Sequence, residues 1–159
     1  MTDFAGLLKS LASAEVEFIL IGGAAAIAHG SSRMTEDVDV VYRRSGENVV
    51  NLVQALAGKN PYLRGAPPGL PFSWDEETIQ RGLNFTLTTD SGAIDLFAEI
   101  PGGGTYDDLL PHCVELSLFG VVCLCIDAPT LIRVKRAAGR PKDLEAIAEI
   151  ESLLAEEDD

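Results

Sequence analysis

Asp37 and Asp39 are the residues whose types and spacing most directly suggest chemistry. A single valine separates them, and they lie in an apolar run that ends at Tyr42. Because side chains alternate faces along a strand, both carboxylates point to the same side of a segment that is otherwise suited to burial. Buried ionised groups need compensation, and a hard divalent cation such as Mg²⁺ suits a set of oxygen ligands. This strand is therefore a candidate metal site.

Asp95 is a third carboxylate inside an apolar segment, where a lone charge has no simple structural purpose. If strand 93–97 lies beside strand 38–42, the two backbones are about 4.8 Å apart, and the three carboxylates can surround one or two metal ions. Without a metal they would repel one another and hold protons tightly. We therefore predict one catalytic and metal-binding cluster of Asp37, Asp39 and Asp95.

The glycine pair Gly22-Gly23 suggests a phosphate site upstream of these carboxylates. It follows the short apolar strand 18–21 and leads into an alanine-rich helix, 24–29, so backbone N–H groups and the helix dipole suit an anion there. A tight strand-to-helix turn is the structural alternative for the two glycines. Ser31 and Ser32 add hydroxyl groups in the following loop, which places triphosphate donors and metal ligands at the same end of adjacent strands.

Length and composition are those of one globular domain. The chain has 159 residues, of which 47% are hydrophobic and 23% charged, and we expect a single domain over 1–159. No apolar stretch is long enough to span a bilayer, so we expect a cytoplasmic protein without membrane partners. The three cysteines are an odd number in strand-like surroundings, which favours buried thiols over disulfides or zinc ligands.

The net charge of −13 argues against a protein coated for polyanion binding. The charge is unevenly distributed, because five of the twelve basic residues lie within ten positions, 133–142, while the sequence from Glu145 onward is strongly acidic. A local anion site is therefore compatible with the acidic composition.

Periodicity and turn residues predict a mixed sheet flanked by helices, which is an α/β (α+β) fold. A proline- and glycine-rich stretch, 58–72, reads as an irregular excursion, and Gly102 to Gly104 read as a loop before a short helix. A capping box, Ser73 to Glu76, opens a short helix ending at about Arg81. A first helix, capped by Thr2 or Asp3, is expected from Phe4 to about Ala14. The other expected helices are 47–56, 129–138 and 141–154, and the other expected strands form the hairpins 83–88 with 93–97 and 114–119 with 121–126.

The order of these motifs resembles the nucleotidyltransferase superfamily of the polymerase-beta type. The shared pattern is Gly22-Gly23, a short helix, Asp37-Val38-Asp39 on the next strand, and a third acid at Asp95. Residues 29–39 look particularly like small bacterial and archaeal members related to AbiEii-type toxins. Residues 131–144 are also similar, with Lys135 on one helix and an Arg-x-Lys-Asp sequence opening the next. The resemblance covers residues 18–147 and implies a nucleotidyltransferase fold with a C-terminal helical segment, 129–155.

The resemblance also implies roles for individual residues. Asp37 and Asp39 would hold Mg²⁺ on the triphosphate, and Asp95 would complete a second metal site and orient or deprotonate the acceptor hydroxyl. Lys135 would approach the triphosphate from the C-terminal helices. The β and γ phosphates would be contacted by Gly22, Gly23, Ser31 and Ser32.

The implied activity is Mg²⁺-dependent transfer of a nucleoside monophosphate from a nucleoside triphosphate (NTP) such as ATP to a hydroxyl group. The resemblance favours the toxin of a toxin–antitoxin pair, acting on RNA and partnered by an antitoxin protein. Two alternatives stay open, namely a small-molecule adenylyltransferase of the antibiotic-modifying kind and a catalytically inactive nucleotide-binding module.

The remaining chemistry-bearing residues have simpler interpretations. We expect His29 to be a packing or C-cap residue, and Trp74 to belong to the core or a lid in preference to a base-stacking platform. Arg33, Arg43 and Arg44 have two interpretations. They are either solvated or paired with Glu36 and Glu47, or they form, with the 133–142 cluster, a positive funnel around the carboxylates.

Overall fold

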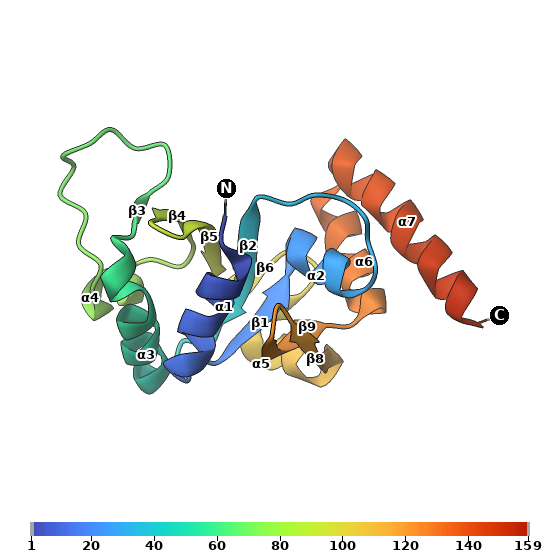
Figure 1. Ribbon diagram of the computed structural model, residues 1–159, viewed down its shortest axis with the longest axis horizontal. Coiled ribbons are helices and arrows are strands. Elements are labelled where there is room, and N and C mark those ends of the chain that lie inside the picture. The colour runs from blue at the N-terminus through green and yellow to red at the C-terminus, as the bar shows by residue number, and fades with distance from the viewer. Residues whose placement is uncertain (1, 159) are drawn as a thin grey trace.

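The computed structural model describes residues 2–158 and is built around one large mixed sheet (Figure 1). Within this range the sheet has seven strands in the order β3-β4-β5-β2-β1-β9-β8. The strands are β1 (Phe18–Ile21), β2 (Asp37–Tyr42), β3 (Tyr62–Leu63), β4 (Phe85–Thr89), β5 (Gly92–Phe97), β8 (Cys113–Leu118) and β9 (Val121–Ile126). A separate small hairpin joins β6 (Glu99–Ile100) to β7 (Gly104–Thr105). The predicted mixed sheet is thus confirmed.

Helices cover the sheet on both sides and extend beyond it at the C-terminal end. They are α1 (Phe4–Ser13), α2 (Gly22–Ala28), α3 (Gly46–Leu56), α4 (Glu76–Arg81), α5 (Tyr106–Leu109), α6 (Ala128–Ala138) and α7 (Pro141–Asp158), with short 3₁₀ turns at Ala57–Lys59 and Leu110–His112. Figure 1 shows α6 and α7 together at one end of the sheet and the excursion after β3 at the other. Between them lies the edge where β2 and β5 begin.

Strand β1 lies in the interior of the sheet, between β2 and β9, which explains the continuous apolar run at 18–21. It pairs antiparallel with β2 and parallel with β9, and all four of its residues are buried. Strand β2 pairs on its other side with β5 in parallel, which is the neighbour relation expected from the carboxylate pattern. Since a parallel pair needs a crossover, α3, β3, α4 and β4 all lie between these two strands in the chain.

Three expected helix boundaries differ from the structure. Helix α2 begins at Gly22, so the glycine pair forms its first turn instead of preceding it. The capping box at Ser73 was wrong, because Asp75 is the N-cap and accepts a hydrogen bond from the Thr78 N–H at 2.8 Å. Helix α7 continues through the acidic segment to Asp158, where residues of good helix propensity meet no glycine or proline.

The excursion at 58–72 also contains structure that its composition concealed. Tyr62 and Leu63 form β3, which pairs antiparallel with β4 at the edge of the sheet. The glycine run 102–104 was expected as a loop, and the structure brings Gly104 into β7, followed by α5 with a capping box of Thr105 and Asp108. Both strands are two residues long, too short for a periodic signal.

Asn48 fixes the end of the β1–β2 pair that lies far from the carboxylates. Its amide is buried, with 2% of the residue exposed, and it donates to the carbonyls of Glu17 at 3.0 Å and Arg43 at 2.7 Å. Its carbonyl oxygen accepts from the Glu17 N–H at 2.6 Å. Asn48 on α3 therefore ties together the residue before β1 and the residue after β2.

We expect Asn48→Ala to lower the free energy of unfolding by about 2 to 4 kcal/mol, because it removes a buried amide and its three hydrogen bonds to backbone groups of Glu17 and Arg43. Urea denaturation followed by circular dichroism measures the change. Asn51→Ala on the same helix is the matched control, since Asn51 makes one long hydrogen bond of 3.4 Å and should change stability by less than about 0.5 kcal/mol. Equal losses for the two variants would contradict the role assigned to Asn48.

Candidate active site

The three predicted carboxylates come together at the start of β2 and β5. The parallel register places Asp39 directly opposite Asp95, and Asp37 lies on the same face of β2 as Asp39. One carboxylate oxygen from each residue lies within 4.8 Å of the others. The prediction that these residues form one cluster is confirmed, and strand pairing is the reason for it.

Asp39 has the most perturbed environment of the three. The pKa of Asp39 is raised from its ordinary 3.8 to about 8. Burial is the largest cause, followed by the charge and hydrogen bond of Asp95 and the charge of Asp37, while the charge of Arg64 acts in the opposite direction. Among the described residues, its buried Oδ1 atom finds no hydrogen-bond partner. A convergent set of carboxylate oxygens with one unpaired lone-pair donor fits a hard divalent cation.

Arg64 is a member of the site that the sequence did not reveal. Its Nη2 atom lies 2.7 Å from Asp95 Oδ1 and donates to the Leu87 carbonyl at 2.7 Å, and its Nη1 atom lies 3.7 Å from Asp37 Oδ2. Arg64 follows β3 directly, inside the excursion that reads as irregular. The only available signal was the apolar pair Tyr62-Leu63 between Pro61 and Gly65, which is too short to identify a strand.

The glycine pair is required by the carboxylates as well as by the turn. Gly22 has φ +67°, and a Cβ atom there would lie 2.2 Å from Asp39 Oδ2. A Cβ atom on Gly23 would lie 2.6 Å from Thr35 Oγ1. Both glycines therefore let the first turn of α2 pass close to the loop and strand that carry the acids, and both line the cavity described next.

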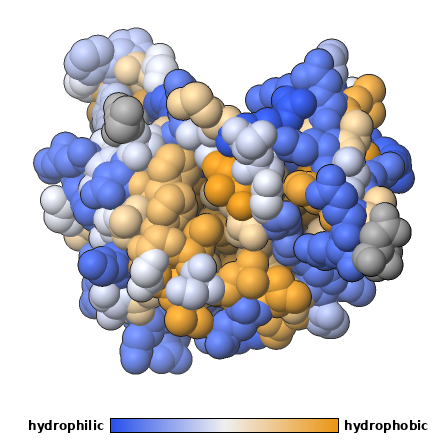
Figure 2. Space-filling model, turned by 45° about the vertical axis from the view of Figure 1, so that its right-hand side comes forward, coloured by the Kyte–Doolittle hydropathy of each residue, from blue (hydrophilic) through white to orange (hydrophobic). Residues whose placement is uncertain are grey.

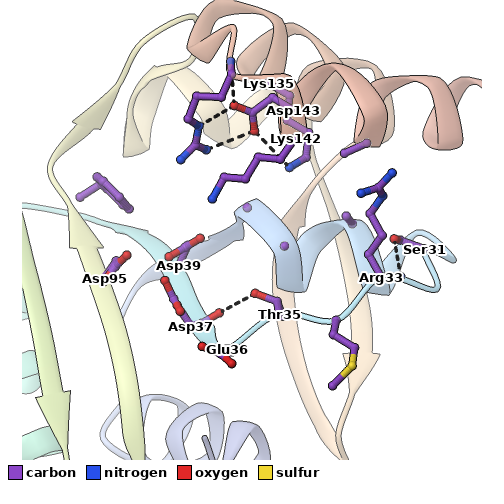
Figure 3. A pocket seen from close by; sticks show the side chains of 17 residues that line it. Ser31, Arg33, Thr35, Glu36, Asp37, Asp39, Asp95, Lys135, Lys142 and Asp143 are labelled. Atoms are coloured by element: carbon purple, nitrogen blue, oxygen red, sulfur yellow. Dashed lines mark hydrogen bonds and ion pairs between the residues drawn. The ribbon is translucent and has the colours of Figure 1, made fainter.

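A cavity of about 620 Å³ opens in front of the triad (Figure 3). Figure 3 shows the aspartates of β2 and β5 on one side and Lys135, Lys142 and Asp143 of α6 and α7 on the opposite side. Its lining also includes Gly22, Gly23, Ser31, Arg33, Met34, Thr35, Glu36, Phe97 and Arg140. In Figure 2 the upper edge of the molecule is notched between two largely hydrophilic projections.

Asp143 organises the basic side of this cavity. Only 2% of the residue is exposed, and its carboxylate accepts from Arg140 Nε at 2.6 Å and lies 4.0 Å from Lys135 Nζ. Burial alone would raise the pKa of Asp143, but the hydrogen bond and charge of Arg140 and the charge of Lys135 lower it. Burial lowers the pKa of Lys135, whose side chain is 12% exposed, and Asp143 acts against that lowering.

Ser31 and Ser32 lie in the loop beside the cavity and bind a carboxylate of α7. Glu149 Oε1 accepts a hydrogen bond from Ser31 Oγ at 2.5 Å, and Glu149 Oε2 accepts one from Ser32 Oγ at 3.2 Å. Arg33 lies 3.6 Å from the same carboxylate and 3.4 Å from Glu145. Ser31 lines the cavity, whereas Ser32 points to α7 from its rim.

The remaining basic residues do not form the funnel that one interpretation of the sequence suggested. Arg43 pairs with Glu17 and with Asp107, and stacks over the Tyr106 ring. The partners of Arg44 are the Tyr42 hydroxyl and the carbonyls of Ile79, Gln80 and Gly82. Arg43 and Arg44 follow the end of β2, whereas the triad lies near its beginning, so both are far from the acids. Of these three arginines, only Arg33 lines the cavity.

Other residues behave as their simpler interpretations predicted. His29 is the C-cap of α2, and its Nε2 atom lies 2.7 Å from the Ile126 carbonyl oxygen. Trp74 packs against the core and donates from Nε1 to the Val53 carbonyl at 3.0 Å. All three cysteines are free thiols. Within residues 2–158, no helix has the length and apolar character needed to cross a membrane.

This order of strands, with three acids on β2 and β5 and C-terminal helices over them, is the nucleotidyltransferase fold, and solved structures support that assignment. The lincosamide adenylyltransferase LnuA, bound to lincomycin, matches with a TM-score of 0.61 and 16% identity, covering 96% of this chain and 98% of LnuA. The enzyme ANT(2″)-Ia in complex with adenylyl-2″-tobramycin matches with a TM-score of 0.54 and 16% identity, covering 94% and 91%. A solution structure of ANT(2″)-Ia matches with a TM-score of 0.54 and 17% identity, covering 94% and 86%.

These likenesses are structural. No protein-family model matches the sequence, and no curated protein matches it. The three structures named above are antibiotic nucleotidyltransferases, and they do not confirm the resemblance to AbiEii-type toxins.

We expect Gly22→Ala to disrupt the site, because the new Cβ would meet Asp39 Oδ2 and the backbone has a positive φ. Asp39 would have to move, so binding of Mn²⁺, used as a paramagnetic probe of the triad, should weaken by at least about tenfold. Electron paramagnetic resonance of free Mn²⁺ measures this. Gly58→Ala is the control, because no described atom lies within 4 Å of its added Cβ. Unchanged Mn²⁺ binding in Gly22→Ala would refute the packing constraint.

The raised pKa of Asp39 predicts that metal-free protein loses stability as pH rises. Between the unfolded value near 3.8 and the folded value of about 8, the folded state holds a proton that the unfolded state has released. The unfolding free energy in EDTA should therefore fall from pH 5.5 to pH 8, by about 1 to 3 kcal/mol more for the wild type than for Asp39→Asn. Urea denaturation of both proteins tests this, and parallel pH profiles would contradict it.

Proposed function

We propose that this protein is a metal-dependent nucleotidyltransferase that transfers a nucleoside monophosphate from an NTP to a hydroxyl group of a small molecule. The observation that carries the proposal is the triad of Asp37, Asp39 and Asp95, with the unpaired Asp39 Oδ1, opposite a basic wall in one cavity. A binding module has no need for three carboxylates at this cost. We further propose that the whole chain, 1–159, acts as one such unit.

The acids fit a pair of Mg²⁺ ions, which in this chemistry stabilise the attacking and leaving oxygens and the charge on the triphosphate. Asp37 and Asp39 would hold the nucleotide side, and Asp95 would hold the acceptor side. The acceptor oxygen forms a bond to the α-phosphorus while the bond from that phosphorus to the bridging β-phosphate oxygen breaks, so pyrophosphate leaves. In this proposal Asp95 would orient the attacking hydroxyl or receive its proton.

The opposite wall supplies cations for the phosphates. Lys135 is held by the buried Asp143 and faces the triad across the cavity. Gly22 and Gly23 line the same space and leave room for close approach of a phosphate. We also propose that Ser31 and Ser32 contact the β and γ phosphates. Their hydroxyl groups would then have to release the Glu149 carboxylate and donate to phosphate oxygens instead.

A small-molecule acceptor is better supported than RNA. The named structures that share the fold over nearly their whole length are antibiotic adenylyltransferases, and one of them holds adenylyl-2″-tobramycin. The net charge is −13, and basic residues at the cavity such as Arg33 and Arg140 are paired with carboxylates of α7. Little unpaired positive charge is therefore available for a large polyanion. The hypothesis of a toxin with an RNA acceptor and an antitoxin partner lacks a comparable observation.

Labelled transfer tests the proposal. We expect α-phosphate label from at least one NTP to appear, with Mg²⁺ and not with EDTA, in a panel of hydroxyl-bearing small molecules that includes lincomycin and tobramycin. Label on the γ-phosphate should not be transferred, because it leaves with pyrophosphate. Total RNA and protein extract are the competing acceptor fractions.

Asp39→Asn should abolish the transfer, while Asp90→Asn, which removes an exposed carboxylate on the β4–β5 turn, should leave it intact. Label in RNA alone would replace the small-molecule acceptor with the toxin hypothesis. If calorimetry showed NTP binding and no fraction took up label, the nucleotide-binding module would be the better description.

A further inference from the structure

Arg64 reaches the triad along a single row of the sheet. The β3–β4 register pairs Leu63 with Leu87, and the Arg64 N–H donates to the Thr86 carbonyl at 3.0 Å. Thr86 lies opposite Asp95 on β5, and Asp95 lies opposite Asp39 on β2. The backbone of Arg64 therefore lies at the edge of the sheet, in register with Thr86, Asp95 and Asp39 on the neighbouring strands.

The guanidinium group of Arg64 is the positive charge nearest these acids. Among residues 2–158, it makes the only ion pairs recorded for Asp37 and Asp95. The two contacts differ, because Asp95 Oδ1 is hydrogen-bonded at 2.7 Å whereas Asp37 Oδ2 is 3.7 Å away. Three carboxylates within 4.8 Å of one another repel strongly without a counter-charge, and an arginine supplies one that does not depend on pH.

Backbone contacts hold Arg64 in place independently of the acids. Its N–H is bound by the Thr86 carbonyl, and Nη2 is also bound by the Leu87 carbonyl at 2.7 Å. Its side chain is 31% exposed, and its Nε atom is buried without a partner among the described residues. Arg64 is thus attached to β4 and makes its ion pairs across that strand.

We propose that Arg64 is a resident counter-cation of the triad and competes with divalent metal for Asp37 and Asp95. The proposal rests on the metal site of the proposed function. Arg64 already occupies Oδ1, one of the two oxygens that Asp95 can offer to a metal, and the +1 charge beside the site opposes the entry of a +2 ion. Arg64 therefore sets metal affinity at the triad, stabilising the metal-free protein at the expense of metal binding.

The first test compares Mn²⁺ binding by calorimetry for the wild type, Arg64→Gln and Arg81→Gln. Arg81 is 78% exposed and pairs with Glu77 on α4, so its variant changes the net charge equally without touching the site. We expect Arg64→Gln to bind Mn²⁺ about five- to tenfold more tightly than the wild type, and Arg81→Gln to remain within about twofold. Equal or weaker binding by Arg64→Gln would overturn the competition, while leaving the proposed function intact.

Failure of the proposed function gives a different result. If neither the wild type nor Arg64→Gln binds Mn²⁺, the metal site itself is wrong, and the competition falls with it. Arg64→Lys is the second variant, because it keeps the charge and should bind Mn²⁺ within about twofold of the wild type. A lysine variant that bound as tightly as the glutamine variant would show that charge is not the basis of the effect.

A second test uses no metal. In EDTA, Arg64→Gln should lower the melting temperature of the wild type by several degrees, about 2 to 6 °C. In an Asp95→Asn background the same substitution should cost less than half as much, because the main partner of Arg64 has lost its charge. Equal losses in the two backgrounds would show that Arg64 acts through packing alone, and would overturn the counter-cation role.

Discussion

Repulsion among three neighbouring carboxylates is the constraint on which the rest of this site depends. Strand pairing places Asp39 directly opposite Asp95, and Asp37 lies two residues before Asp39 on the same face of β2. The protein accommodates this in three ways, with a proton on Asp39, a guanidinium group on Asp95 and an open cavity in front of both. Each of these reduces the repulsion among charges that the sheet holds together.

The glycine pair is coupled to the same constraint. A glycine at the start of a helix can leave room for a ligand. Gly22 also leaves room for a carboxylate of the protein itself, because a Cβ atom there would meet Asp39 Oδ2. The helix, the turn and the acid therefore form one packed unit. A phosphate bound at this turn would be positioned relative to the three acids by the backbone itself.

Much of this arrangement could be predicted from the sequence, because its signals are local. Alternation in 37–42 and 93–97 identified two strands with acids on defined faces, and the glycine pair located the turn. What could not be predicted depends on contacts between distant segments. Arg64 lies beside a two-residue strand whose existence depends on pairing with β4, and the engagement of Ser31 and Ser32 by Glu149 joins residues more than a hundred positions apart.

The engagement of Glu149 has a consequence for the order in which the site is made. Lys142, Asp143 and Glu149 belong to α7, which follows every strand in the chain. During synthesis the strands that carry the acids can pair before α7 has emerged, so the nascent chain can hold its carboxylates together before Lys142 and Asp143 are in place on the opposite wall. The loop 31–33 gains its carboxylate partner only when α7 docks. A ribosome-bound intermediate would thus present the acids with Arg64 beside them but without the contribution of α7, and the two sides of the cavity would meet only when α7 docks.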